Sequence, residues 1–204
     1  MLILALDSCG TACSVLLWQD GRILEQMRED MLRGQDARLI PMIVSAMEKA
    51  GLQFSDLDKI AVTRGPGSFT GVRVGLAAAC GLGLAARKPV LGVDRFVLYR
   101  HLHKDRDHGL LVVIDSKRAE YFCKYFSVSE NDHEPCLMTS DAIQTFISAH
   151  PDTKIVGDLA TPDDEITLAC AHLAASASSD DPQFLPRPLY LRAPDVTFPA
   201  AKSR

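Results

Sequence analysis

The sequence has few aromatic residues and no excess of positive charge. Phe, Trp and Tyr make up 6% of the 204 residues, Trp occurs once, and the formal net charge is −4. Proteins that bind single-stranded nucleic acid use aromatic platforms, and phosphate contacts need clustered Lys and Arg. These shortages argue against a protein that coats nucleic acid by itself. If RNA is involved, we expect another subunit to supply the basic surface.

Cysteine pairs at metal-binding spacing are also missing. None of the six cysteines forms a Cys-x-x-Cys pair, and the first residues are a strand-like apolar run without a basic segment or cleavage site. We therefore expect reduced thiols in a cytoplasmic protein, without a disulfide framework. The longest apolar run covers residues 74–86. It is shorter than the ~20 residues that span a bilayer, so it predicts a buried helix and no membrane contact.

Familiar catalytic and metal-binding motifs are absent from the sequence. There is no Gly-x-Ser-x-Gly, no His-Glu-x-x-His, and no Gly-Lys-Ser/Thr ending after Gly65-Pro66-Gly67. His101 and His103 lie in a highly charged stretch that is typical of a solvated loop. We predict no catalytic residue, no metal site and no cofactor, and leave open whether a nucleotide binds where the chain meets a partner.

Strand-like and helix-like segments alternate in the first half of the sequence. Three strand-like runs lie between residues 2 and 29, and Gln19-Asp20-Gly21 is a strong hairpin signal. Hairpin-linked strands pair antiparallel, whereas strand–helix–strand units give parallel pairs. The sequence therefore predicts a mixed five-stranded sheet, made of this meander, helices over 36–50 and 70–86, and strands over 59–63 and 90–93.

The second half of the sequence predicts a smaller lobe, from about residue 105 to 190. Its apolar runs are shorter, and Ser, Asp and Pro become frequent after residue 175. The expected elements are a helix over 95–103, a hairpin of 110–115 with 118–128, a helix over 140–149, a strand over 154–156 and a helix over 163–174.

Two predicted helices are more apolar than a helix that buries only one face. The 36–50 helix has an apolar sector much wider than a single stripe. The 70–86 helix repeats small residues every fourth position, which lets another backbone approach closely. We favour a dimer or heterodimer seam here, with packing against the chain's own sheet as the alternative. The residues assigned to this partner surface are Leu39, Ile40, Ile43, Met47, Gly71, Gly75, Ala79 and Gly83.

Two turns could bind phosphate or could be purely structural. Asp7 ends the first strand and is followed by Ser8-Cys9-Gly10-Thr11, a corner where a carboxylate can hold a cation and turn amides can meet phosphate. The alternative is an aspartate that caps a turn. The Gly65-Pro66-Gly67 turn opens a helix and could face an anion or a partner. Its alternative is a tight strand-to-helix connection.

One long run is specific enough to indicate a family. It reads Thr63-Arg64-Gly65-Pro66-Gly67-Ser68-Phe69-Thr70-Gly71-Val72-Arg73-Val74-Gly75. With it, the chain resembles the bacterial TsaB family, formerly called YeaZ, of tRNA threonylcarbamoyladenosine biosynthesis. The resemblance extends over nearly the whole chain and also rests on residues 3–8, 12–15, 39–43, 89–93, 113–121 and 188–192.

The resemblance implies an α/β, actin-like ATPase (ASKHA) fold of two related lobes, each a mixed sheet with helices, the second reduced. It suggests a first, partner-binding lobe over 1–104, a second over 105–192, and a tail over 193–204 for which we expect disorder. The family is a paralogue of TsaD, which transfers threonylcarbamoyl to adenosine 37 of tRNAs that read codons starting with A. TsaD carries His-x-x-x-His after the strand corresponding to 90–93, where this chain has Asp94-Arg95-Phe96-Val97-Leu98.

A non-catalytic activating subunit is therefore the implied role. Its implied partners are TsaD as a heterodimer, the ATPase TsaE, a second copy when alone, and tRNA only through the complex. The family is understood to bind TsaD through first-lobe helices, so we expect charged or bulky replacements of Ile43 or Gly75 to break the complex and spare the fold. Relatives often have His-Ser where this chain has Gln35-Asp36. The alternative function is a small actin-like ATPase or kinase that uses Asp7.

Overall fold

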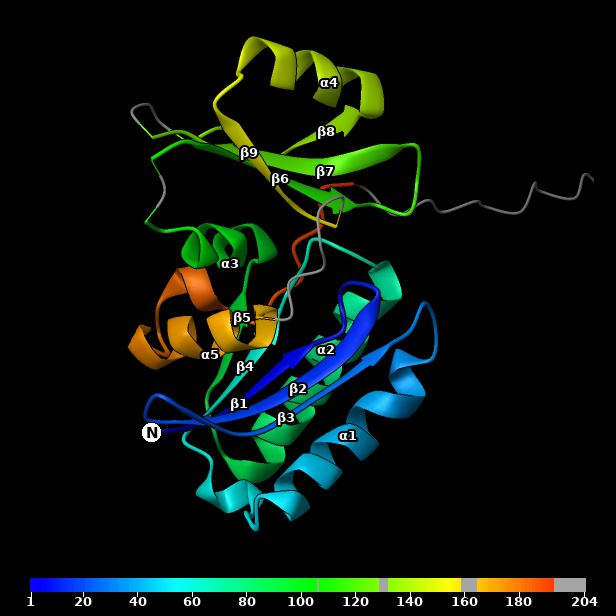
Figure 1. Cartoon of the computed structure of the whole chain (residues 1–204). Helices are drawn as coiled ribbons and strands as arrows, with labels where there is room; N and C mark the ends of the chain where they lie inside the picture. The colour runs from blue at the N-terminus through cyan, green and yellow to red at the C-terminus, as the bar shows by residue number, and fades with distance from the viewer. Residues whose placement is uncertain (106, 129–131, 159–164, 193–204) are drawn as a thin grey trace, which may run out of the picture.

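A five-stranded sheet forms the base of the molecule in the computed structural model, which describes residues 1–105, 107–128, 132–158 and 165–192 (Figure 1). Its strand order is β3-β2-β1-β4-β5. β1 pairs antiparallel with β2 and parallel with β4, so the predicted mixed sheet is confirmed. The strands are β1 (Leu2–Asp7), β2 (Ala12–Gln19), β3 (Arg22–Asp30), β4 (Lys59–Thr63) and β5 (Val90–Val93).

The burial of each strand follows its position in this sheet. Every residue of the central strand β1 is buried, which explains its continuous apolar sequence. The edge strand β3 is charged and mostly exposed, as expected for a strand that must not pair with another chain. Asp20 and Gly21 have φ of 47° and 90°. These values fit the predicted hairpin turn between β2 and β3.

Helices α1 (Gln35–Lys49) and α2 (Phe69–Ala86) cover one face of the first sheet. The Ser68 side chain caps α2 by accepting a hydrogen bond from the Gly71 N–H at 3.3 Å. Both helices begin one residue earlier than the sequence predicted. A short 3-10 helix, η1 (Phe54–Asp56), leads from α1 into β4. A second one, η2 (Pro182–Phe184), contacts β5.

The second sheet has four strands in the order β8-β7-β6-β9. They are β6 (Gly109–Asp115), β7 (Glu120–Phe126), β8 (Cys136–Thr139) and β9 (Thr153–Gly157). β6 pairs antiparallel with β7 and parallel with β9. Helix α4 (Ser140–Ala149) lies on the outer face of this sheet (Figure 1). Strand β8 was not predicted, because Cys136–Thr139 lacks the valines that identify the equally short β5 as a strand.

Helices α3 (Arg95–Leu102) and α5 (Ile166–Ser176) lie between the two sheets and share one core with both (Figure 1). α5 packs mainly against β1, β4 and β2 of the first sheet. The Lys59 ammonium donates to the Ala174 and Ala177 carbonyls at its end, at 2.9 and 2.8 Å. Helix α5 thus packs on the first sheet although its residues lie in 105–192, the range predicted for the second lobe. That division stays a prediction, and the expected tail over 193–204 lies outside the described residues.

Candidate functional site

The corner at the end of β1 is a closed structural turn. Asp7 is 7% exposed, and its Oδ1 accepts hydrogen bonds from the Thr63 hydroxyl and, at 3.1 Å, from the Cys9 N–H. The Cys9 thiol lies 3.4 Å from the Thr63 carbonyl oxygen. Burial and, second, the Asp7 carboxylate raise the pKa of Cys9 to about 12, so this thiol stays neutral. The aspartate joins β1 to β4, which favours the purely structural alternative.

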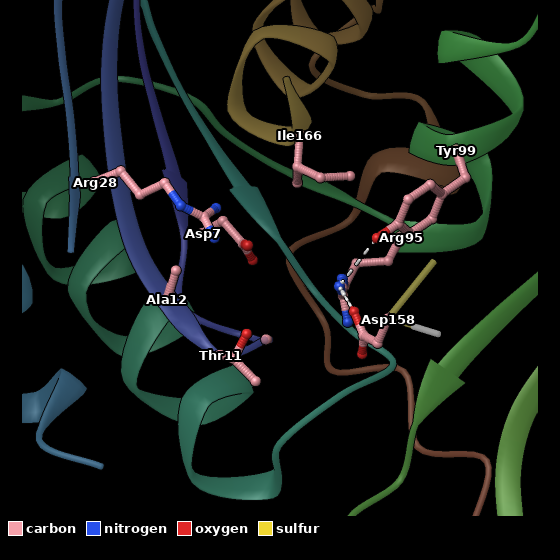
Figure 2. Close-up of a pocket in the computed structure, with 9 residues that line it drawn as sticks. Asp7, Thr11, Ala12, Arg28, Arg95, Tyr99, Asp158 and Ile166 are labelled. Atoms are coloured by element: carbon pink, nitrogen blue, oxygen red, sulfur yellow. Dashed lines mark hydrogen bonds and ion pairs between the residues drawn. The ribbon is translucent and has the colours of Figure 1, made fainter. Parts of the chain in front are cut away.

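Arg95 fills the space between the lobes at this corner (Figure 2). Its side chain is 3% exposed and donates to Asp158 at 2.9 Å and to the Pro66 carbonyl at 3.2 Å. Asp158 also accepts the Asp115 N–H at 3.0 Å. Burial lowers the pKa of Arg95, but the carboxylates of Asp158 and Asp7 outweigh it and leave that pKa well above its usual value. A permanently charged guanidinium therefore links α3, the 65–67 loop and the ends of β6 and β9.

The pocket that remains beside Arg95 is very small. It is lined by Asp7, Thr11, Arg28 and Tyr99 among others, and its volume is about 30 Å³. A water molecule needs a comparable space, whereas small-molecule sites usually measure about 300–1,000 Å³. Among the described residues, this pocket leaves no room for a nucleotide beside Arg95. This arrangement argues against the alternative of an ATPase or kinase that uses Asp7.

The Gly65-Pro66-Gly67 loop packs against the chain and offers no open cradle. The Ser68 N–H donates to the Cys9 carbonyl at 2.8 Å, and the Arg95 N–H donates to the Gly65 carbonyl at 2.8 Å. A Cβ at Gly67 would lie 2.5 Å from the Cys9 carbonyl oxygen, so glycine is required by close approach. The loop is thus a tight connection between β4 and α2. Within the described residues, no three His, Cys, Asp or Glu side chains cluster as a metal site.

The predicted partner surface is mostly internal, which corrects its placement. Leu39, Ile43, Met47 and Ala79 are at most 2% exposed and belong to the core under the first sheet. The small residues of α2 let the chain's own strands approach. An added Cβ would lie 2.0 Å from the Ser8 carbonyl oxygen at Gly71, 2.7 Å from the Ser8 hydroxyl at Gly75, and 2.3 Å from a Val90 methyl at Gly83.

This burial changes two of the expectations for the surface. The alternative of packing inside the chain fits these seven residues, because four lie in the core and Ser8 or Val90 occupies the space beside the three glycines. The expectation that charged or bulky replacements of Ile43 or Gly75 spare the fold is wrong for the same reason. Of the predicted residues, Ile40 is the exposed one, at 44%.

The exposed surface of these helices includes an apolar face along their adjacent flanks. On α1, Arg38 and Lys49 bind Glu29 and Glu25 of β3, so the opposite flank with Ile40 and Val44 points toward α2. α2 carries no charged residue from Val74 to Ala86, and Leu84 is 84% exposed. The residues of this α1–α2 face are Ile40, Val44, Val74, Ala77, Ala78, Gly81, Leu84 and Ala85.

Helix α2 also meets the length and hydropathy expected of a membrane-crossing helix. Its 18 residues have a mean hydropathy of 1.5, and it is the one such helix in the described parts of the chain. Core helices pass the same test, and α2 lays one face on the first sheet. The opposite face of α2 is exposed.

Comparison with known proteins relates the chain to one family. The family model for TsaD, tRNA N6-adenosine threonylcarbamoyltransferase, matches residues 29–155. A tRNA threonylcarbamoyladenosine biosynthesis protein TsaB of Escherichia coli K12 is 35% identical over 64% of this chain and 57% of its own length. A TsaB of Haemophilus influenzae is 41% identical over 60% and 52%. The chain therefore spans little more than half the length of these relatives.

Solved structures match the fold along nearly the whole chain. A Pseudomonas aeruginosa protein described as similar to the peptidase YeaZ has a TM-score of 0.71 and 24% identity, and covers 94% of this chain. YeaZ of the same organism has a TM-score of 0.69 and 23% identity over 93%. Together with the paired mixed sheets, these matches confirm the predicted actin-like class with a reduced second lobe.

Proposed function

This chain belongs to the TsaD family and, within it, to the TsaB (YeaZ) group, and we propose that it serves threonylcarbamoyladenosine formation on tRNA as a docking subunit that performs no reaction itself. The observation that carries the proposal is a contrast between two surfaces. Arg95 fills the cleft where an actin-like enzyme would bind nucleotide, whereas the α1–α2 face is open and uncharged on α2.

The partner that fits best is the catalytic paralogue TsaD. Because the TsaD model matches residues 29–155, which include α1 and α2, the two proteins share these helices. Like helix pairs can meet about a pseudo-twofold axis and bury each other's apolar flanks. The same geometry allows a homodimer when TsaD is absent. TsaE and tRNA would then bind through the complex with TsaD. The protein would act in the cytoplasm.

The decisive experiment replaces exposed residues of the α1–α2 face. Val44 is 39% exposed, and Val44→Glu or Ile40→Glu places a charge where the partner's apolar side chains would lie. We expect at least about a tenfold loss of affinity for TsaD, measured by calorimetry, because burying an unpaired charge costs more than ~1.4 kcal/mol. Thermal unfolding should barely change, since both positions face solvent in the free chain.

Val128→Glu is the matched control, because Val128 is also apolar and is 57% exposed, but follows β7 in the second lobe. It should bind TsaD like the wild type. Unchanged affinity in both helix variants would refute the docking surface. ATP hydrolysis by the purified chain alone, lost in Asp7→Asn without loss of structure, would instead support the enzyme.

A further inference from the structure

Two cysteines face each other across the outer edge of the second sheet. The register of β7 and β8 places Cys123 directly opposite Cys136. Cys123 and Met138 belong to the cluster beneath α4, and Met138 lies two residues beyond Cys136. Because side chains alternate along a strand, Cys136 projects to the same face as Met138 and therefore as Cys123.

The backbone spacing suits a disulfide between these residues. Directly opposite residues of antiparallel strands have Cα atoms about 4.5–5.5 Å apart, and disulfides span Cα separations of about 4.4–6.8 Å. Their Cβ atoms must approach by at most about 1 Å. Cys136 is the first residue of β8, a four-residue edge strand that pairs with β7 alone in the second sheet. Such a strand end can make this small movement.

The two thiols also differ in solvent exposure, which sets the order in which an oxidant reaches them. Cys136 is exposed, whereas Cys123 is completely buried, and both are free thiols. An oxidant can therefore reach Cys136 first, and Cys123 is the neighbouring thiol that can resolve the product. The other exposed cysteine, Cys80, lies on α2 in the first lobe.

We propose that Cys123 and Cys136 are a reversible redox pair that closes to a disulfide when a peroxide reaches Cys136. In the first step the Cys136 sulfur attacks the peroxide O–O bond, becomes a sulfenic acid, and releases water or an alcohol. In the second step the Cys123 sulfur displaces hydroxide from that sulfenic acid, the S–S bond forms, and a second water leaves. A dithiol reductant restores both thiols.

The disulfide would tie β8 to β7 and thereby fix the start of α4. β8 ends at Thr139, whose hydroxyl caps α4 by accepting the Ala142 N–H at 3.2 Å. Partial burial raises the pKa of Cys136, and burial with the nearby Cys136 raises the pKa of Cys123 to about 12. Few thiolates exist near neutral pH, so oxidation should be slow there and accelerate as the pH rises.

The test treats the full-length chain with hydrogen peroxide at several pH values and maps its peptides by mass spectrometry. We expect a Cys123–Cys136 cross-linked peptide, lighter by two hydrogen atoms than the separate peptides, that disappears with dithiothreitol. Its rate of formation should rise about tenfold per pH unit below the pKa of Cys136. Hydrogen exchange of β8 amides should slow in the oxidised protein.

Three variants make the result unambiguous. Cys123→Ala should leave Cys136 as a sulfenic acid that a cyclic dione traps, and Cys136→Ser should leave Cys123 unmodified. Cys80→Ser should behave like the wild type. The proposal is overturned if the wild type over-oxidises at Cys136 with Cys123 still a thiol, or if Cys80 is the cysteine that becomes cross-linked.

Discussion

The two sheets of this chain share the order of four strands, and the first sheet has one strand more. In the first, β3-β2-β1-β4 joins an antiparallel meander to one parallel strand, and β8-β7-β6-β9 repeats this order in the second. α1 lies between β3 and β4 in sequence, as α4 lies between β8 and β9. This shared plan is visible in the topology although no repeat is evident in the sequence.

The two sheets differ in the elements that come after the parallel strand. After β4, α2 covers the first sheet and β5 extends it, whereas after β9 the helix α5 leaves its own lobe and packs on β1 and β4. The second sheet has no counterpart of β5 among the described residues. The reduced lobe thus shares its inner core with the first lobe, and the first lobe needs helix α5, which follows the second sheet in the sequence.

The largest effect should come from breaking the ion pair between the lobes. Arg95→Ala leaves Asp158, whose side chain is 19% exposed, without its cation. We expect a loss of about 3 kcal/mol in the free energy of unfolding, measured with urea, because removing one partner of a buried pair costs ~3–5 kcal/mol. Arg100→Ala is the control on the same helix. Its pair with Asp132 is exposed, so its loss should be below about 1 kcal/mol.

A smaller effect, confined to the first sheet, should result from adding a side chain to a glycine on the face of α2 that packs on that sheet. Gly71→Ala would force a methyl to within 2.0 Å of the Ser8 carbonyl oxygen, and the backbone there cannot yield cheaply. We expect a destabilisation of about 2–3 kcal/mol in the same urea experiment. In Gly81→Ala nothing lies within 4 Å of the new Cβ. That control should stabilise α2 by about 1 kcal/mol, and equal effects of both variants would contradict the close packing of α2 on Ser8.

The smallest effect, within about one pH unit above 9.0, concerns the pH dependence of stability at the turn after β1 that holds Cys9. The folded pKa of Cys9 is raised from 9.0 to about 12, so the unfolded chain ionises first as the pH rises. The stability is therefore fully present below pH 9 and declines as the pH approaches 12, by at most ~1.4 kcal/mol per pH unit for one thiol. Cys9→Ala should flatten the alkaline side of the stability profile. An unchanged slope would exclude this thiol as a cause.

Local signals in the sequence predicted much of the fold. The end of α2 was predicted correctly and its start to within one residue, because the Gly65-Pro66-Gly67 turn precedes it and Lys88-Pro89 follows its last turn. The destination of α5 was not predictable, because periodicity shows that a helix has an apolar face but not which sheet it covers. β8 was missed because it is held by pairing with β7 more than by its own sequence pattern.

The candidate site shows the same limit. The sequence correctly indicated that something approaches the small residues of α2, but Ser8 and Val90 of the chain itself are what approaches. Ile40 was assigned to the surface, and it is exposed, whereas its neighbours Leu39 and Ile43 turn inward. Arg95 was noted as a place where histidine is missing. Its contacts with Pro66 and Asp158 come from segments far away in sequence, so no local pattern could reveal them.

The hydrogen bonds from Lys59 to the end of α5 have a consequence for folding during synthesis. The ribosome synthesises β1 and β4 long before residues 166–176. The apolar side of these strands therefore stays uncovered by α5 until the whole second sheet has been synthesised. During that interval the nascent chain exposes a surface that chaperones can hold.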